Sequence, residues 1–291
     1  MNQASAWRVE LARTIAAVYA ENPQVRMVAL GGSAARGTAD AFSDMDMAVY
    51  WQPLDDAYLD AAPLARSGAE RFTFRRLFEG QVALEQYYIG PAKLDVVHFA
   101  MGWWEQTVAD VTERADLADE KHEVLDGFMG AIALHGLGEY ERWRERIGAF
   151  PDALAHAMVA RSLRFYPEWV LAQHGLARRD LLNFYAILCE MIGNLLGVLA
   201  GLNRLYHSME KPKHSAELLR RMQIVPANAA ARIEALLAGE RECAPAELAA
   251  LVDETLALVE QHMPAVDTTR ARMIQRMPAT PVEQAPPFPR A

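Results

Sequence analysis

The pattern of apolar residues changes near Trp103, and this change limits the folds open to the chain. Before it, apolar residues come in short runs separated by turn-forming residues, which is typical of strands. After it, they recur at helical spacing as far as residue 263. The runs that predict strands are Val25–Leu30, Met45–Trp51, Phe72–Leu77, Val82–Ile89 and Leu94–Phe99. We therefore expect an α+β fold, with a small mixed sheet in an α/β N-terminal domain and an all-α helical bundle after it.

Two domains also suit the length of 291 residues, because one domain typically takes roughly 100–200 residues. The change of pattern predicts a first domain over residues 1–115 and a helical domain over residues 116–265. Residues 266–291 are rich in proline and show little periodicity after Met277. We expect them to form a tail that lies along the surface or is disordered.

The charge balance restricts the class of partner. The chain has 29 Lys and Arg residues against 38 Asp and Glu residues, so its net charge is 29 − 38 = −9. An acidic chain of this kind argues against a protein built mainly to bind nucleic-acid phosphates. It suits an enzyme that acts on small molecules, or one whose substrate is a cation.

The sequence predicts a soluble, cytoplasmic protein. Charged residues interrupt the N-terminal segment, so we expect no signal peptide. The most apolar stretch, residues 186–202, contains Glu190, Asn194 and several glycines, which favour close helix packing over a membrane span. Cys189 and Cys243 are the only cysteines, and their apolar, helix-like surroundings predict buried, reduced thiols.

The strand predicted at Val25–Leu30 ends in a turn that suits an anion. Gly31 and Gly32 follow it directly and let the backbone approach a ligand without interference from a Cβ atom. Ser33 is then the expected N-cap of a short helix, whose first N–H groups would point to the same place. A strand, two glycines and a helix start together predict a cradle for a polyphosphate.

Three aspartates are the candidate metal ligands. Asp44 and Asp46 are two residues apart at the start of a predicted strand, so their side chains share one face of the sheet. Asp95 lies in another apolar strand, where an aspartate is costly unless it is paired or coordinated. Carboxylate oxygens beside a phosphate cradle predict a Mg²⁺ site for phosphoryl-type transfer, with room for two ions.

Glu85, on the preceding predicted strand, competes with Asp95 as the third acidic residue. The outcome depends on the hairpin that joins their strands. An even number of loop residues turns Glu85 away from Asp95, whereas an odd number brings the two to one side.

These residues resemble the active-site signature of the polymerase-β-like nucleotidyltransferase superfamily. The resemblance rests on three segments, Gly31–Gly37, Ser43–Asp46 and Leu94–Val97. It points in particular to bacterial enzymes that adenylylate small antibiotics such as aminoglycosides and lincosamides. It implies a nucleotidyltransferase catalytic domain over residues 1–115 and a helical substrate-binding domain over residues 116–265.

The resemblance also implies roles for individual residues. The Gly31–Ser33 turn would bind the triphosphate of the nucleotide. Asp44 and Asp46 would be metal ligands, and Asp95 the third ligand or the base that takes the proton from the attacking hydroxyl.

Five further residues are candidate contacts. Arg36 is either a phosphate contact or a solvated arginine of the first helical turn, and Ser43 is either a nucleotide contact or, as we favour, a local turn former. Arg204, Lys211 and Lys213 lie in a segment dense in hydrogen-bonding groups, which resembles segments near the nucleotide or substrate in related nucleotidyltransferases. They are candidate contacts to phosphate or acceptor.

The sequence thus predicts a Mg²⁺-dependent enzyme that moves a nucleoside monophosphate, with ATP as the leading co-substrate, to a hydroxyl of a small acceptor. Transfer to a protein or RNA end is the alternative reaction, and a non-catalytic nucleotide-binding module is the alternative without catalysis. We expect no membrane or nucleic-acid partner, and a monomer or homodimer.

Overall fold

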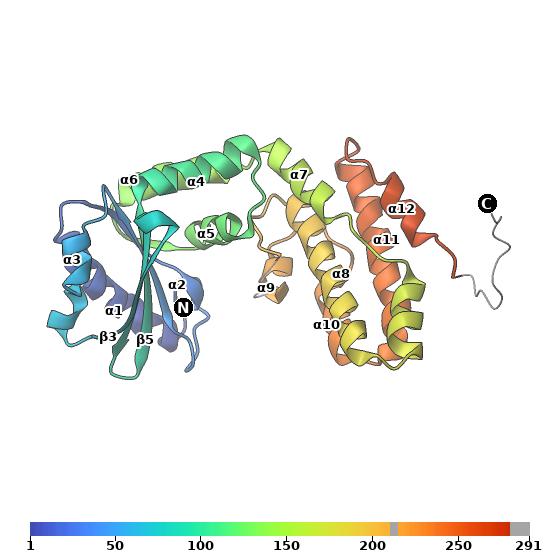
Figure 1. Cartoon of the computed structure of the whole chain (residues 1–291), viewed down its shortest axis with the longest axis horizontal. Helices are drawn as coiled ribbons and strands as arrows, with labels where there is room; N and C mark the ends of the chain where they lie inside the picture. Colours follow the sequence, from blue (N-terminus) through green and yellow to red (C-terminus); the bar gives the residue numbers. More distant parts are fainter. Residues whose placement is uncertain (210–214, 280–291) are drawn as a thin grey trace, which may run out of the picture. The chain divides into compact units, whose positions relative to one another are not determined.

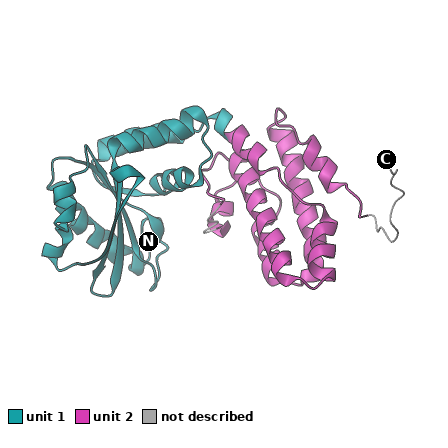
Figure 2. Ribbon diagram, viewed as in Figure 1, with its two compact units in different colours: residues 1–154 teal, residues 155–291 magenta. Residues whose placement is uncertain are grey.

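The chain folds into two compact units, Met1–Leu154 and Ala155–Ala291 (Figure 2). The structure is a computed structural model and describes residues 1–209 and 215–279. The first unit contains a six-stranded mixed sheet with helices. Within the described residues, the second unit contains helices and no strand. The predicted α+β class is therefore confirmed.

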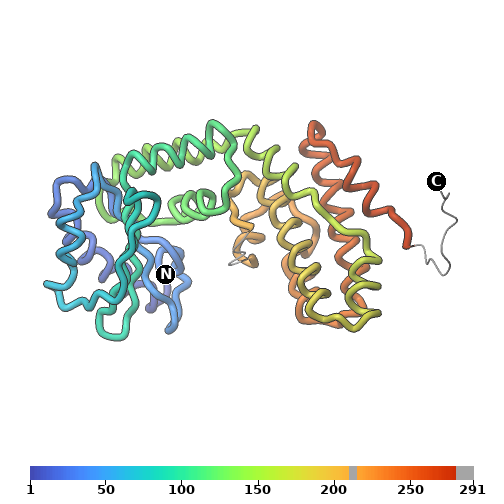
Figure 3. The backbone as a smooth tube through the Cα atoms, viewed as in Figure 1, coloured from blue at the N-terminus to red at the C-terminus, as the bar shows by residue number. Residues whose placement is uncertain are grey.

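The sheet of the first unit, in which Figure 1 labels β3 and β5, has the strand order β3-β4-β5-β2-β1-β6. Its strands are β1 (Val25–Leu30), β2 (Met45–Trp51), β3 (Glu70–Leu77), β4 (Val82–Ile89), β5 (Ala92–Ala100) and β6 (Ile132–His135). Only β2 and β5 pair in parallel, and the other neighbours are antiparallel. In Figure 3 the chain runs through β3, β4 and β5 in succession. All five strands expected from the sequence are present.

Strand β6 was not expected, because helical periodicity was predicted to dominate from about Trp103 to residue 263, with a break near Gly136–Gly138. It pairs with β1, with Leu30 opposite Ile132. All four residues of β6 are half-buried, so they lack the alternation that marks a strand in a sequence. Because β6 belongs to the sheet, the first unit continues past the predicted boundary at residue 115 and ends at Leu154.

Gly136, the residue after β6, offers a test of this arrangement. Its φ is +71°, and a Cβ atom there would overlap the carbonyl oxygen of Arg26 on β1. Gly136→Ala is therefore expected to lower the free energy of unfolding by about 3 kcal/mol, from left-handed backbone strain and overlap together. Urea unfolding measures the loss. Gly138→Ala is the control, because a Cβ there meets nothing within 4 Å; an equal loss in both variants would contradict the pairing.

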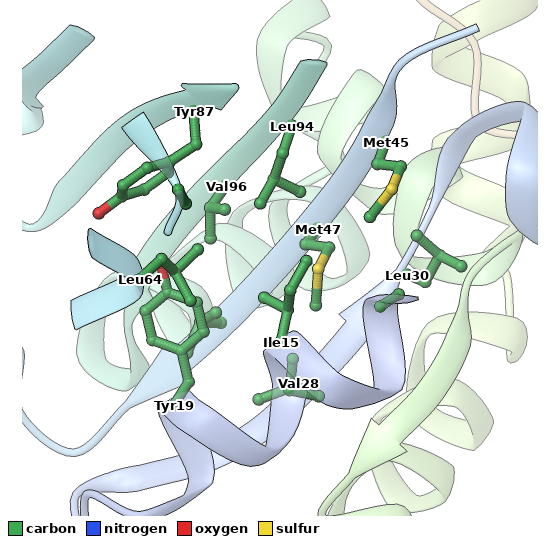
Figure 4. Packing of buried hydrophobic residues seen from close by; sticks show 14 of the residues in the cluster. Ile15, Tyr19, Val28, Leu30, Met45, Met47, Leu64, Tyr87, Leu94 and Val96 are labelled. Carbon is green, nitrogen blue, oxygen red and sulfur yellow. The ribbon is translucent and has the colours of Figure 1, made fainter. Parts of the chain in front are cut away.

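Helices and short helical turns complete the first unit. They are α1 (Gln3–Ala20), α2 (Gly32–Arg36), α3 (Asp56–Asp60), η1 (Pro63–Ser67), η2 (Phe78–Gly80), α4 (Met101–Arg114), α5 (Asp119–Met129) and α6 (Leu137–Gly148). Helix α1 contributes Ile15 and Tyr19 to the main buried cluster, which also contains Met47 and Val96 from the sheet (Figure 4). This cluster fills the face of the sheet on which α1 packs.

On the other face of the sheet, packed side chains cover β2 and β5 at one end and leave the opposite end open to solvent. Tyr50 and Phe99, at the ends of β2 and β5, pack against Trp104 of α4, with ring centroids 5.0 and 6.2 Å away. At the opposite ends of the same strands, Asp46 is exposed and Asp95 is half-buried. The side chains with candidate chemistry therefore lie at the open end of this face.

Helix α8 forms the core of the second unit. The elements after the sheet unit are α7 (Asp152–Ser162, which starts in the first unit), η3 (Val170–Ala177, a π-helix), α8 (Leu181–Leu202), α9 (Ser215–Arg220), α10 (Ala229–Ala238), η4 (Arg241–Cys243), α11 (Ala244–His262) and α12 (Thr269–Gln275). By length and composition α8 could cross a membrane, but 67% of its apolar window is buried inside the protein. A Cβ at Gly201 would press on Val159 and Met158 of α7, so close helix packing explains this glycine.

One expectation for this half of the chain was wrong, because the two thiols are not buried. Cys189 and Cys243 are both exposed; Cys189 lies one helical turn after Tyr185, which is also exposed, on the outer side of α8. The expected tail starting at residue 266 contains helix α12, where Arg272 pairs with Glu260 at 2.8 Å. Helix α12 also buries Ala271, so this part of the segment lies along the surface of the unit.

Candidate active site

The three aspartates predicted from the sequence come together at the open end of the sheet. Asp46 on β2 lies directly opposite Asp95 on the parallel neighbour β5. Asp44 precedes Asp46 by two residues, just before β2 begins. One ligand oxygen from each lies within 4.8 Å of the other two. We call this set, Asp44, Asp46 and Asp95, the carboxylate triad.

The triad has the chemistry of a site for a hard cation. Carboxylate oxygens are the ligands that Mg²⁺ and Ca²⁺ prefer in proteins. Three carboxylates this close repel one another unless a positive charge lies among them. The residues present therefore fit a divalent metal ion, which the triad could hold.

The turn after β1 contacts the triad through its backbone. The Gly31 N–H donates a hydrogen bond of 2.8 Å to the carbonyl oxygen of Asp46. Gly32 has a φ of +64°, and a Cβ atom on it would overlap the carboxylate oxygen Oδ2 of Asp46. A glycine at this position is thus what allows the Asp46 carboxylate to lie against the turn.

The predicted cap of α2 was wrong by two residues. The N-cap is Gly31, which has no side chain to accept a hydrogen bond, and Ser33 is the second residue of the helix. Gly32, the first residue of the helix, has a positive φ, which glycine adopts without a Cβ penalty. Ser33 is half-buried beside the turn.

Gly32→Ala is expected to weaken metal binding because the new methyl group must displace the Asp46 carboxylate. The left-handed backbone should also cost about 1–2 kcal/mol of stability. Gly68→Ala is the matched control: its φ is +80°, but a Cβ there meets nothing within 4 Å. Titration with Mn²⁺ should show a raised Kd for Gly32→Ala alone. Equal Kd values in the two variants would show that Gly32 does not support the triad.

Two residues not predicted from the sequence also contact the triad. The Nζ atom of Lys93 lies 2.8 Å from Oδ2 of Asp95 and 3.3 Å from Oδ2 of Asp44. The hydrogen bond to Asp95 raises the pKa of this lysine. Gln86 on β4 lies opposite Asp95 and donates a hydrogen bond of 3.1 Å to its Oδ1. The signal for Lys93 was its position two residues before Asp95, which places both side chains on one face of β5.

Glu85 does not join the triad. Strand β4 places Gln86 opposite Asp95 and Glu85 opposite Val96. The loop between Ile89 and Ala92 has two residues, so the even case holds and Glu85 points to the other face of the sheet.

Instead, Glu85 is the centre of a buried hydrogen-bond network, with none of its side chain exposed. Its donors are Tyr19 (2.9 Å), Tyr87 (2.8 Å), His98 (2.9 Å) and Arg71 (3.2 Å). The indole N–H of Trp51 donates to Nδ1 of His98, which assigns the hydrogen on Nε2 to the bond with Glu85. Burial alone would raise the pKa of Glu85, but the hydrogen bonds from His98, Tyr87 and Tyr19 outweigh it and lower the pKa.

The remaining candidate contacts are spread over the chain. Arg36 is exposed at the end of α2. The Ser43 hydroxyl accepts a hydrogen bond from the Asp40 N–H and donates one to the Asp40 carboxylate, so it shapes the turn before the triad. Arg204 belongs to the second unit and is exposed, with a φ of +51°. Lys211 and Lys213 lie outside the described residues.

Comparisons with known proteins give similarities of two kinds, to a family and to solved structures. A family described as a domain of unknown function (DUF4037) matches residues 117–212, less than half of the chain. The crystal structure of a nucleotidyltransferase-like protein from Exiguobacterium sibiricum 255-15 is similar at a TM-score of 0.38 and 12% sequence identity. That match covers 88% of this chain and 78% of the other. No curated protein matches the chain.

Proposed function

We propose that the protein is a Mg²⁺-dependent nucleotidyltransferase that moves a nucleoside monophosphate, AMP from ATP in the first instance, to a hydroxyl of a small acceptor. The observation that carries the proposal is the carboxylate triad, with its ligand oxygens within 4.8 Å of one another. The glycine turn after β1 contacts this triad directly. An acidic cluster beside a backbone cradle suits a metal-bound polyphosphate.

Each part of the site has a role in this reaction. Mg²⁺, one ion or two, would neutralise the charge of the triphosphate and of the leaving pyrophosphate. Asp44 and Asp46 hold the metal, and the Gly31–Ser33 turn binds the phosphates. Asp95 is the third ligand, or it takes the proton from the acceptor hydroxyl. It lies on the strand next to that of Asp46, so both act on one reacting centre.

The acceptor is proposed to be small and cationic, in the manner of an aminoglycoside or lincosamide, which would make the protein a factor in antibiotic resistance. The net charge of −9 favours a cation. We place Arg204 of the second unit, with Lys211 and Lys213, among the contacts to acceptor or phosphate. The protein is proposed to work in the cytoplasm as a monomer or homodimer, without a membrane or nucleic-acid partner.

The test is an incubation of the protein with Mg²⁺, each of the four nucleoside triphosphates, and a panel of acceptors. The panel contains aminoglycosides, lincosamides, a protein mixture and tRNA. Pyrophosphate release and an acceptor mass increased by one nucleoside monophosphate support the proposal when the acceptor is small. Modification of protein or tRNA would show that the acceptor is a macromolecule and not a small molecule. Binding of Mg²⁺ and ATP without release of pyrophosphate on any acceptor would indicate a binding module.

A further inference from the structure

We propose that Lys93 is an internal counterion of the carboxylate triad, which it holds together in the metal-free protein and must leave when a metal ion binds. The inference rests on the proposed function of the triad as a metal centre. Its basis is that Nζ of Lys93 contacts two of the three carboxylates, at 2.8 Å from Asp95 and 3.3 Å from Asp44. A positive charge at this place neutralises part of the repulsion that a divalent cation would neutralise.

The position of Lys93 on the strand makes this contact local. Lys93 and Asp95 are two residues apart on β5, so their side chains leave the same face of the sheet. Asp44 is reached across the parallel neighbour β2, where Met45 is opposite Leu94. The lysine therefore bridges the two strands that supply the triad, at the end where the sheet face is open.

Partial exposure to solvent allows the lysine to leave. The side chain of Lys93 is 35% exposed, and those of Asp44 and Asp95 are 41% and 21% exposed. A lysine ammonium on its flexible four-carbon stem can turn into water without being buried as an unpaired charge. A metal ion that takes the carboxylate oxygens can thus displace the ammonium at the cost of two partly solvated ion pairs.

This exchange predicts that removing a residue of the site increases its metal affinity, whereas the loss of a contact usually lowers it. If Lys93 competes with the metal, its removal makes metal binding tighter, because no ion pair has to be broken. If Lys93 were a structural residue that places the carboxylates, its removal would make metal binding weaker. The direction of the change in metal affinity therefore separates the two roles without any measurement of catalysis.

The experiment compares Lys93→Met with Lys121→Met by titration with Mn²⁺ alone, followed by the electron paramagnetic resonance signal of the free ion. Lys121 is a matched control because it also bridges two aspartates, Asp110 at 2.6 Å and Asp116 at 2.5 Å. The Mn²⁺ Kd should fall about fivefold in Lys93→Met, as expected for the loss of about 1 kcal/mol of competing ion pairs. It should not change in Lys121→Met. An unchanged or higher Kd in Lys93→Met overturns the inference.

Melting temperatures give a second readout. In the presence of a chelator, Lys93→Met should melt below the wild type, because the triad has lost its counterion. Saturating Mn²⁺ should remove this difference, whereas a deficit that persists would show a purely structural lysine. If Lys93→Met binds Mn²⁺ no more tightly than the wild type, Lys93 does not compete with the metal, but the triad is still a metal centre. Absence of Mn²⁺ binding in both proteins overturns the metal centre and the role of Lys93 together.

Discussion

Replacing Asp46 by asparagine is expected to lower the rate of nucleotide transfer about a thousandfold, because a metal centre supplies several kcal/mol of charge stabilisation in the transition state. Asp46 is the triad member that faces both neighbours: it lies opposite Asp95 in the sheet and against Gly32 in the turn. An amide in its place keeps the shape of the side chain but loses its charge and one oxygen ligand. The loss should therefore appear in metal binding as well as in the reaction rate.

The variant should remain folded, since the Asp46 side chain is exposed and removing its charge relieves repulsion within the triad. Asp56→Asn is a matched control that removes one exposed aspartate charge on α3, outside the triad. Pyrophosphate release measures the rate, Mn²⁺ titration the metal affinity, and urea unfolding the stability. Transfer by Asp46→Asn within about tenfold of the wild type would exclude the triad as the reacting centre, because so small a loss is only about 1.4 kcal/mol.

The sequence predicted the parts of this site that depend on local spacing. Asp44 and Asp46 share a face because strand side chains alternate, and the alternation of buried and exposed residues at the start of β2 bears this out. The two glycines after β1 marked the turn for the same kind of reason. Asp95 was different, because local spacing cannot show that β5 lies next to β2. Asp95 was a candidate because an aspartate in an apolar strand is costly unless it is paired or coordinated. The parallel pairing of β2 with β5 is what places it opposite Asp46.

Features that depend on tertiary contacts could not be predicted in this way. Strand β6 has four half-buried residues and forms only because β1 offers a free edge. The first unit consequently reaches Leu154, well beyond the point where the helical pattern begins. The choice between Asp95 and Glu85 likewise required the length of one hairpin loop, which fixes the face on which each side chain lies.

Glu85 and Asp95, the two candidates for the third acidic residue, should give opposite results when each is replaced by its amide: one variant loses stability and the other loses transfer activity. Glu85→Gln is expected to lower the free energy of unfolding by about 3 kcal/mol while the folded protein keeps its transfer activity. Asp95→Asn should lose transfer and change stability by less than about 1 kcal/mol, because its ion pair with Lys93 is partly solvated. Loss of transfer in folded Glu85→Gln, with transfer retained in Asp95→Asn, would assign the base to Glu85.

The stability cost at Glu85 follows from its donors. His98 donates to one carboxylate oxygen and Arg71 to the other, and both donors are N–H groups of fixed direction. Turned toward His98, the glutamine NH₂ group faces a fully buried N–H donor, and both groups stay unsatisfied. Turned toward Arg71, it faces a guanidinium that is 24% exposed and keeps its hydrogen bond to the Leu59 carbonyl oxygen, and the charge of the pair is lost. The isosteric change is therefore a strong test, because it removes no volume from the core.

The lowered pKa of Glu85 predicts how this cost depends on pH. A carboxyl group whose pKa is lower in the folded protein than in the unfolded chain stabilises the fold above its unfolded pKa, about 4.3 for glutamate. That stabilisation is lost as the pH falls through the folded pKa. The difference in unfolding free energy between wild type and Glu85→Gln should therefore be largest near pH 7 and shrink below about pH 4. Urea unfolding from pH 3 to pH 7 measures it, and a difference that does not change with pH would mean that the carboxylate charge contributes nothing. In that case the network would stabilise the fold through hydrogen bonds and packing that do not depend on the charge of Glu85.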